Sequence, residues 1–407
     1  MMAAHMSDKW RTLLILAAAE LLAMGLWFSM SAVSPSLAVE WGLTPSQTGW
    51  LTTAVQIGFV AGALTVAFTN VADIYPPPVV VAIGATLGAL ATTLIAVAAH
   101  GMALALPLRF LTGFALAAVY PVGMKIMASW TREDRGLGLG LLVGALTIGS
   151  ASPHLVRSLG GLGAWRNVLT IAAILSVIGG GAIWRLVKMG PYHVPAPRFD
   201  WRHASRAWTE PGLRLANLGY LGHMWELYAM WTWIPAFLLA SFRASGLASP
   251  DRTASLAAFA VIAVGGLGSL LAGRMGDRWG RTRTTILSLV VSGSCSILIG
   301  FFYGASPALV LAVALVWGIS IVADSAQFST AVSELSDREY LGTALAMQTA
   351  LGFLLTMASI QLIPVAEAGL GWSRVFRLLA LGPVLGIPAM WKLKRSPMAA
   401  RLAGGRG

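Results

Sequence analysis

Cysteine and charged residues are both scarce in this chain of 407 residues. The single cysteine, Cys295, lies in an apolar stretch, so no internal disulfide can form and cysteine usage does not indicate a redox compartment. Charged residues make up 11% of the chain, against roughly 25% in an ordinary soluble domain. Together with the 57% of hydrophobic residues, this scarcity of charge predicts an integral membrane protein.

The motifs of ATP-driven pumps and of common membrane hydrolases are missing as well. The chain contains no Gly-Lys pair, which the phosphate-binding loop of an ATPase requires. None of its six histidines forms a His-Glu-x-x-His pair, and no nucleophile motif is present. We therefore expect neither enzymatic activity nor a cofactor, and any uphill transport has to draw on an ion gradient.

Apolar runs of about 20 residues, long enough to cross a bilayer, recur along the whole chain. Twelve can be placed, at 12–33, 46–69, 79–99, 102–127, 137–157, 166–186, 213–240, 254–273, 284–304, 307–331, 341–364 and 374–391. A proline-containing polar stretch at 187–212 divides them into six and six. We predict an all-α integral membrane fold with an N-terminal six-helix bundle at 1–186, a cytoplasmic linker at 187–212, and a C-terminal bundle with a short tail at 213–407.

The positions of the 28 lysines and arginines explain the net charge of +12. Two of them, Arg109 and Lys125, lie within spans. Six lie in segments on the side opposite the N-terminus: Arg157, Arg166, Arg243, Arg252, Arg374 and Arg377. All the others fall on the N-terminal side, which is the positive-inside pattern of a multi-pass protein of the inner (plasma) membrane. The pattern predicts cytoplasmic termini and contact with membrane lipids, and it removes the need for a nucleic-acid partner.

An internal repeat indicates a duplicated architecture. Residues 20–27 and 226–233 match at five of eight positions, at a constant offset of 206. Glu, Met and Trp recur at i, i+4 and i+7, so they share one helical face in each copy. A glutamate inside an apolar span is uncommon and usually functional, so we interpret the two halves as pseudo-symmetric, each with its own buried acid.

Two motifs resemble those of the major facilitator superfamily. The loop at 273–283, with sequence GRMGDRWGRTR, is similar to the superfamily's cytoplasmic signature, and Arg109 to Gly113, followed by Tyr120, resembles its fourth-helix pattern. The loop at 70–78 keeps an acid but lacks the glycines and arginines. The resemblance implies a cytoplasmic gate made by Asp73, Gly273, Asp277, Arg278, Gly280 and Arg281.

The resemblance also implies two bundles around a central cavity lined by helices 1, 4, 7 and 10. Each of these helices carries an ionisable residue within its span: Glu20, Arg109, His223 with Glu226, and Asp324. A charge facing lipid at the helix centre costs about 2.5–3.5 kcal/mol, so these groups should face protein or water. Because burial favours the neutral form of an acid and histidine titrates near neutral pH, we assign proton coupling to Glu226, His223, Asp324 and Glu20.

Substrate binding is assigned to the remaining polar and aromatic side chains on these helices: Arg109, Trp27, Tyr120, Trp233, Trp317 and Gln327. Arg109 is expected to contact Glu20 or the substrate, with bonding to backbone carbonyls as the structural alternative. His223 and Glu226, three residues apart on one face, are expected to act as a pair. Lys125 is expected to extend towards the cytoplasmic surface. His154 and Arg157, near the outer end of their helix where water is available, receive no role.

These residues predict a proton-coupled secondary transporter of a small organic solute that works by alternating access. Three acids with tryptophans nearby favour export of an amphipathic or cationic compound, whereas Arg109 favours the alternative of a symporter for a small organic or inorganic anion. A membrane solute sensor without net transport is the alternative from another class. Sodium is the alternative coupling ion, and we expect a monomer. Within the repeat, Glu226 is predicted to carry the proton and Glu20 to act as a fixed charge.

The cation pattern generates a test of topology. A cysteine introduced at Ser205 should be protected from an impermeant thiol reagent in intact cells, because the linker is predicted to be cytoplasmic. A cysteine at Ser249 should react, since the turn after the seventh span is predicted to lie outside. The opposite labelling would overturn the inside assignment of both termini.

Overall fold

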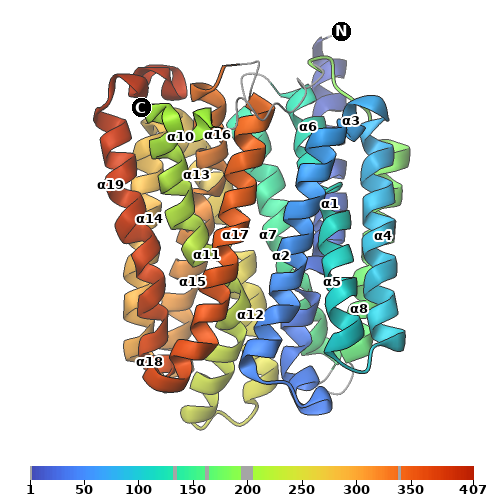
Figure 1. The fold of residues 1–407 in the computed structure, drawn as a ribbon, viewed down its shortest axis with the longest axis vertical. Coiled ribbons are helices and arrows are strands. Elements are labelled where there is room, and N and C mark those ends of the chain that lie inside the picture. Colours follow the sequence, from blue (N-terminus) through green and yellow to red (C-terminus); the bar gives the residue numbers. More distant parts are fainter. Residues whose placement is uncertain (1, 132–134, 161–164, 194–204, 338–340) are drawn as a thin grey trace.

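The computed structural model describes residues 2–131, 135–160, 165–193, 205–337 and 341–407, and within these ranges it is entirely helical. Figure 1 shows long helices that run nearly parallel, with both ends of the chain at the same end of the molecule. The predicted linker at 187–212 lies partly outside the described residues. In the first half the helices are α1 (Met2–Trp41), α2 (Pro45–Thr69), α3 (Val71–Ile74), α4 (Pro77–Ala98), α5 (Met102–Leu116), α6 (Tyr120–Trp130), α7 (Arg135–Gly160) and α8 (Trp165–Leu186).

The second half begins with a short helix and ends in a 3₁₀ tail. Its helices are α10 (Arg206–Thr209), α11 (Pro211–Ala244), α12 (Pro250–Ala263), α13 (Gly265–Trp279), α14 (Arg281–Leu298), η1 (Ile299–Phe302), α15 (Pro307–Ala323), α16 (Ser325–Leu335), α17 (Leu341–Leu370), α18 (Trp372–Val375), η2 (Phe376–Ala380), α19 (Leu381–Arg395) and η3 (Pro397–Gly405). Proline occupies the first turn of several of these helices, where its missing N–H has no intrahelical partner to lose.

Among the described residues, eleven helical segments are long and apolar enough to cross a membrane. They correspond to eleven of the twelve predicted spans. The remaining prediction, 213–240, falls on α11, which is 34 residues long but carries polar and aromatic side chains such as Asn217, His223 and Glu226. The all-helical membrane fold is confirmed, while the twelfth span and the cytoplasmic position of the termini stay predictions.

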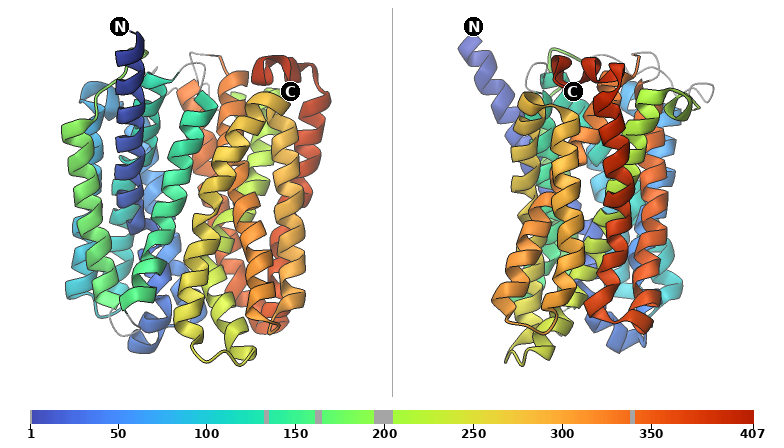
Figure 2. Two further views of the ribbon diagram at one scale, coloured as in Figure 1. Left: turned by 180° about the vertical axis from the view of Figure 1, so that it is seen from behind. Right: turned by 90° about the vertical axis from the view of Figure 1, so that its left-hand side faces the viewer.

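The two halves of the chain lie side by side and meet along two seams. In Figure 1 the first-half helices, from blue to green, group on one side, and the second-half helices, from the yellow-green of α10 and α11 to red, group on the other. One seam joins α2 to α17, and the other joins α7 to α12 and α13. Figure 2 shows the second seam from behind, with α7 alongside the yellow helices. Helix α1 also contacts α11, so the first helices of the two halves meet at the centre.

Two helices break at equivalent points of the internal repeat. The helix that begins at Met102 is interrupted after Leu116 and resumes at Tyr120. Its counterpart in the second half is interrupted at Asp324, which separates α15 from α16. Ala118, in the first break, and Asp324 differ by the repeat offset of 206 residues. Broken helices at membrane depth occur where they line an internal site or are buried in protein.

Small residues allow the helices that carry the site to approach closely. A Cβ added to Gly58 of α2 would collide with the Phe110 carbonyl oxygen, and one added to Gly113 of α5 would collide with the Val55 carbonyl oxygen. Backbone contact of this kind is typical of helix pairs in membranes. Gly113 ends the Arg-to-Gly motif, so the motif places Arg109 on a helix that is pressed against α2.

The tail that follows α19 folds back on the second half. Leu402 is fully buried, the Ala403 N–H donates to Glu334 Oε2 at 2.9 Å, and the Thr282 N–H donates to the Gly407 carbonyl at 3.2 Å. Gly280 adopts a φ of 100°, and a Cβ there would collide with the carbonyl oxygens of residues 406 and 407. The tail is therefore packed against the loop that resembles the superfamily signature.

Candidate functional site

A cluster of six buried aromatic side chains occupies the centre of the molecule, where the two halves meet. They come from α1, α2, α11 and α17 and are Trp27, Phe28, Phe59, Tyr228, Trp231 and Phe353. The Trp27 ring lies 4.7 Å from Phe59 and 5.4 Å from Phe353, and Tyr228 lies 5.0 Å from Phe353. Such contacts between ring centroids are within the favourable range for aromatic pairs. The aromatic cluster thus joins both halves of the chain.

Three N–H groups in and beside the aromatic cluster are buried without a hydrogen-bond partner among the described residues. They are Trp27 Nε1, Trp231 Nε1 and Gln56 Nε2. The Oε1 atom of Gln56 accepts from Thr356 Oγ1 at 2.7 Å, which fixes the amide across the seam between α2 and α17. Because buried donors are normally satisfied, these three mark a site that presents aromatic faces and N–H groups together.

Arg109 bonds to backbone carbonyls, and the expected contact with Glu20 is not made. Its Nε donates to the Leu51 carbonyl at 3.1 Å, Nη1 donates to the Leu26 carbonyl at 2.9 Å, and Nη2 donates to the Trp27 carbonyl. The guanidinium is fully buried. It therefore ties α5 to α1 and α2 directly behind the aromatic cluster. Arg109 therefore bonds to backbone carbonyls, which is the structural alternative given for it in the sequence analysis.

Glu20 lies apart from Arg109. It precedes Leu26 and Trp27, the residues of α1 whose carbonyls Arg109 binds, by about two helical turns. Its side chain is 1% exposed, and neither carboxyl oxygen has a hydrogen-bond partner in the described part of the chain. Gly123 of α6 lies close to the Glu20 carboxyl group, since a Cβ added to this glycine would be 3.3 Å from Glu20 Oε2. A buried carboxyl group without donors is costly when ionised, so Glu20 is suited to hold a proton or to receive a cationic group.

His223 and Glu226 share a helix but do not interact as a pair. Glu226 accepts from Ser292 Oγ at 2.8 Å and from Trp317 Nε1 at 2.7 Å. His223 instead places Nδ1 at 2.8 Å from Asp324 Oδ1. Helical spacing correctly placed the two residues near each other, but neighbouring helices supply a separate partner for each.

The contact between His223 and Asp324 lies at the break between α15 and α16. The other ring nitrogen of His223, Nε2, is 2.9 Å from Ser325 Oγ, so the imidazole spans both residues at the break. Both side chains of this contact are 2% exposed. The two atoms are close, but Asp324 Oδ1 has no partner with hydrogen-bond geometry among the described residues. The contact therefore places two ionisable side chains next to each other at the helix break.

The other predicted binding residues occupy different surroundings. Trp233 donates to the Ile360 carbonyl at 2.9 Å, which links α11 to α17. Trp317 donates to Glu226, and both residues belong to the second half. Gln327 accepts from Arg281 Nη1 at 3.0 Å and so belongs to the predicted gate. Tyr120 is partly exposed at the start of α6. Of the six predicted binding residues, only Trp27 is in the aromatic cluster.

The residues of the predicted second-half gate form a compact network of charges. Arg281 lies 2.7 Å from Asp277 Oδ1 and 3.0 Å from Glu334 Oε1. The Asp277 carboxylate also approaches the first turn of α7, since a Cβ on Gly136 would lie 2.6 Å from Oδ2. Gly273 is close to Gly136 as well, with a Cβ-to-carbonyl approach of 3.0 Å. Arg278 is exposed. Asp277 therefore pairs with Arg281 and lies close to the start of α7.

The predicted first-half gate uses a lysine in place of the missing arginines. Lys125 Nζ lies 2.5 Å from Asp73 Oδ1 and donates to the Ala72 carbonyl at 2.9 Å. Its side chain thus extends from α6 to the loop at 70–78, and its predicted direction towards the cytoplasmic surface stays a prediction. In the second half the acid of the loop, Asp277, pairs instead with Arg281 at the start of α14.

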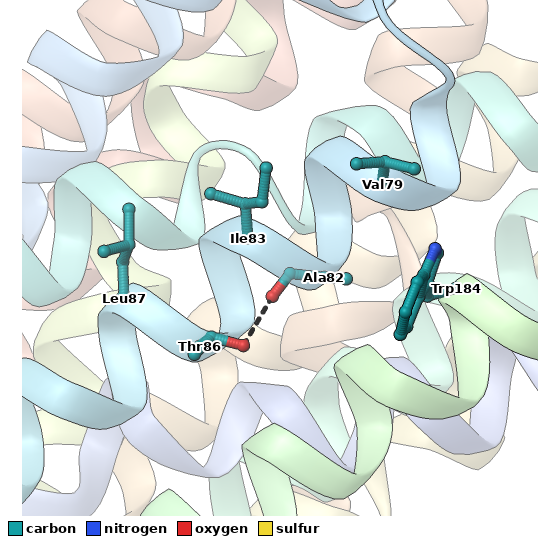
Figure 3. A pocket seen from close by; sticks show the side chains of 6 residues that line it. All are labelled: Val79, Ala82, Ile83, Thr86, Leu87 and Trp184. Atoms are coloured by element: carbon teal, nitrogen blue, oxygen red, sulfur yellow. Dashed lines mark hydrogen bonds between the residues drawn. The ribbon is translucent and has the colours of Figure 1, made fainter.

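An apolar groove lies on the outer face of the first half, between α4 and α8. Its volume is about 370 Å³. Figure 3 shows its lining, which is Val79, Ala82, Ile83, Thr86, Leu87 and Trp184. Two polar side-chain groups are drawn there: the Thr86 hydroxyl, which donates to the Ala82 carbonyl at 2.8 Å, and the indole nitrogen of Trp184. The groove therefore suits a lipid chain better than a polar solute. Among the described residues no cluster of His, Cys, Asp and Glu could hold a metal ion.

The residues that the sequence analysis missed are mostly aromatic. Phe59 and Phe353 lie in apolar spans, where nothing in the sequence separates a site residue from a lipid-facing one. Tyr228 and Trp231 had a usable signal, because they replace Leu22 and Gly25 of the first copy inside the repeat. Positions where the repeat gains an aromatic ring thus pointed to the site.

Comparison with known proteins identifies the family. The profile described as Major Facilitator Superfamily matches residues 15–358. The chain belongs to the major facilitator superfamily. It is 24% identical over 392 residues to a gallate transporter of Pseudomonas putida, a match that covers 86% of this chain and 84% of that protein. It is also 27% identical over 182 residues to the niacin transporter NiaP of Acinetobacter baylyi, covering 42% and 39%.

A solved structure supports the fold of this superfamily member. The crystal structure of the nucleoside transporter NupG (D323A mutant) superposes with a TM-score of 0.71, at 18% sequence identity, over 94% of this chain and 99% of the other. At this identity the likeness bears on the fold alone. The family and the two relatives place the chain among transporters of small organic solutes.

The bonding of Arg109 generates a stability prediction. Arg109→Lys keeps the charge but removes the planar fork that reaches several carbonyls at once. Each charge-assisted hydrogen bond lost costs about 1.5–3 kcal/mol. We expect the melting temperature of the purified protein to fall by about 3 °C or more, whereas Arg283→Lys, on the exposed surface, should leave it unchanged. An unchanged melting temperature with reduced solute uptake would instead assign Arg109 to binding.

Proposed function

We propose that this protein is a proton-coupled transporter of a small aromatic solute that carries hydrogen-bond acceptors, such as an aromatic carboxylate. The observation that carries the proposal is the central aromatic cluster with its unsatisfied donors, Trp27 Nε1, Trp231 Nε1 and Gln56 Nε2. A planar ring can stack between the side chains of the cluster, and a carboxylate or ring nitrogen can accept from the three N–H groups. Both halves contribute, as alternating access around a central site requires.

The relatives are consistent with this class of solute. Gallate and niacin, named for the two relatives, are both aromatic carboxylic acids. Either compound offers a flat ring and a carboxylate, the two features that aromatic side chains and N–H donors can bind. The similarity is distant, so the names supply a class of test compounds rather than the identity of the solute.

A cationic solute is the competing proposal. The sequence favoured export of an amphipathic or cationic compound, and the unpartnered Glu20 carboxyl group is the observation that supports it. Glu20, however, lies two turns from the aromatic cluster, and its environment favours the neutral acid. We therefore prefer a solute with an anionic or neutral hydrogen-bond acceptor over a cationic one, and we propose that Glu20 carries protons.

Proton coupling is proposed to act through His223 and Asp324, with Glu226 and Glu20 as further acids. The contact between His223 and Asp324 joins α11 to the break between α15 and α16. Loss of the proton leaves a buried negative charge or an unsatisfied ring, so protonation biases how these helices pack. In this way a proton can be linked to the opening and closing of the central site.

Uptake of labelled nicotinate and gallate into proteoliposomes tests the proposed solute class. We expect accumulation that depends on an inward proton gradient and exceeds that of protein-free liposomes. Trp231→Phe keeps the ring but removes one donor, so uptake of these acids should fall roughly two- to tenfold. The matched control is Trp184→Phe, which changes a tryptophan in the outer groove.

Competition separates the alternatives. Excess nicotinate should inhibit uptake, whereas benzylamine should not. Inhibition by benzylamine alone would favour the cationic solute. Binding of either compound, detected by tryptophan fluorescence, without flux in any gradient would favour the sensor and contradict the proposed transport.

Two neutralising substitutions test the coupling. Asp324→Asn and Glu226→Gln mimic protonated acids, and both should abolish gradient-driven accumulation while exchange at equal concentrations continues. Asp337→Asn, whose parent side chain is 66% exposed, is the control and should retain both activities. Loss of exchange would assign the acid to binding, and intact gradient coupling would remove it from the proton path.

A further inference from the structure

A second cavity lies at the end of the molecule opposite the two termini, on the seam between α7 and α12. Its volume is about 350 Å³, and both halves of the chain line it. The first half supplies Arg157 and Ser158, and the second half supplies Ser249, Asp251, Arg252 and Ser255, among others. None of these residues belongs to the aromatic cluster or to the proposed proton path. The polar lining distinguishes this seam cavity from the apolar groove.

Arg157 is a buried residue in the lining of the seam cavity. Only 6% of its surface is exposed; Nη1 donates to the Ala32 carbonyl at 2.7 Å, but Nε has no partner among the described residues. One turn away, His154 is fully buried, and neither ring nitrogen has a described partner. The expectation that these two side chains sit in water at the helix end is therefore wrong. A buried guanidinium N–H without an acceptor favours binding of an anion.

The start of α12 adds further donors to the seam cavity. Pro250 occupies the first turn, and Ser249 at the N-cap makes no side-chain capping bond, so N–H groups of the first turn remain available. Asp251 also lines the cavity, but its carboxylate is 3.0 Å from Arg243 Nη2, which offsets its charge. Arg157 and Arg252 then leave the cavity with a net positive charge.

We propose that the seam cavity binds an oxyanion, a carboxylate or a phosphate, between Arg157 and Arg252. The anion accepts from the guanidinium groups and from the first turn of α12, so it bridges the two halves of the chain. Two sources fit this chemistry: a soluble acid and the headgroup of an anionic phospholipid. The site goes beyond the proposed transport function, because it lies on other helices and does not require the central solute.

Thermal unfolding of the purified protein in lipid-free detergent tests the site. Sodium phosphate and sodium acetate are titrated at constant ionic strength, with chloride as the balancing ion. We expect a saturable rise in melting temperature, because a ligand that binds only the folded state stabilises it. In Arg252→Gln and in Arg157→Gln, the half-saturating concentration should rise at least tenfold. Arg374→Gln, at another exposed arginine, is the control and should match the parent.

The shift on adding anion is compared within each variant, so a lower starting melting temperature in Arg157→Gln does not obscure the result. Repeating the titration in phosphatidylglycerol nanodiscs identifies the source. A shift that disappears there supports a headgroup as the occupant, and one that persists supports a soluble acid. The proposal is overturned if phosphate and acetate raise the melting temperature no more than chloride does. It is also overturned if both arginine variants show the same half-saturating concentration as the parent.

Discussion

The burial of one guanidinium group organises the first half of this molecule. Arg109 cannot be left unsatisfied in the membrane interior, where a lone charge is expensive, and its hydrogen bonds go to the backbone of α1 and α2. These two helices carry Trp27, Phe59 and Gln56 of the central site. The charge therefore supports the proposed solute site indirectly, by fixing the helices that carry its residues.

The two predicted gates are held together by ion pairs of different composition. In the first half Asp73 of the loop pairs with Lys125 of α6. In the second half Arg281, at the start of α14, pairs with Asp277 of the loop and with Glu334 of α16. Each loop thus keeps an acid, and the source of the cation differs: α6 in the first half and the loop's own arginine in the second.

Sequence alone predicted the membrane class, eleven of the spans and the family, because each depends on local pattern. It did not predict which partner a buried side chain chooses. Helical periodicity places His223 and Glu226 on one face, yet Asp324, Ser292 and Trp317 come from helices that are far away in sequence. The partners of Arg109 could not be predicted for the same reason, because they are backbone carbonyls, which every residue has. The six residues of the aromatic cluster could not be predicted either, because the apolar spans contain many aromatic side chains and the packing of the helices decides which of them meet.

The tail after α19 brings the end of the described chain into contact with the gate. The Gly407 carbonyl accepts from Thr282, and Glu334 holds the Ala403 N–H as well as Arg281. Because Glu334 holds both the tail and Arg281, any movement of the signature-like loop away from α16 has to break these contacts or carry the tail with it.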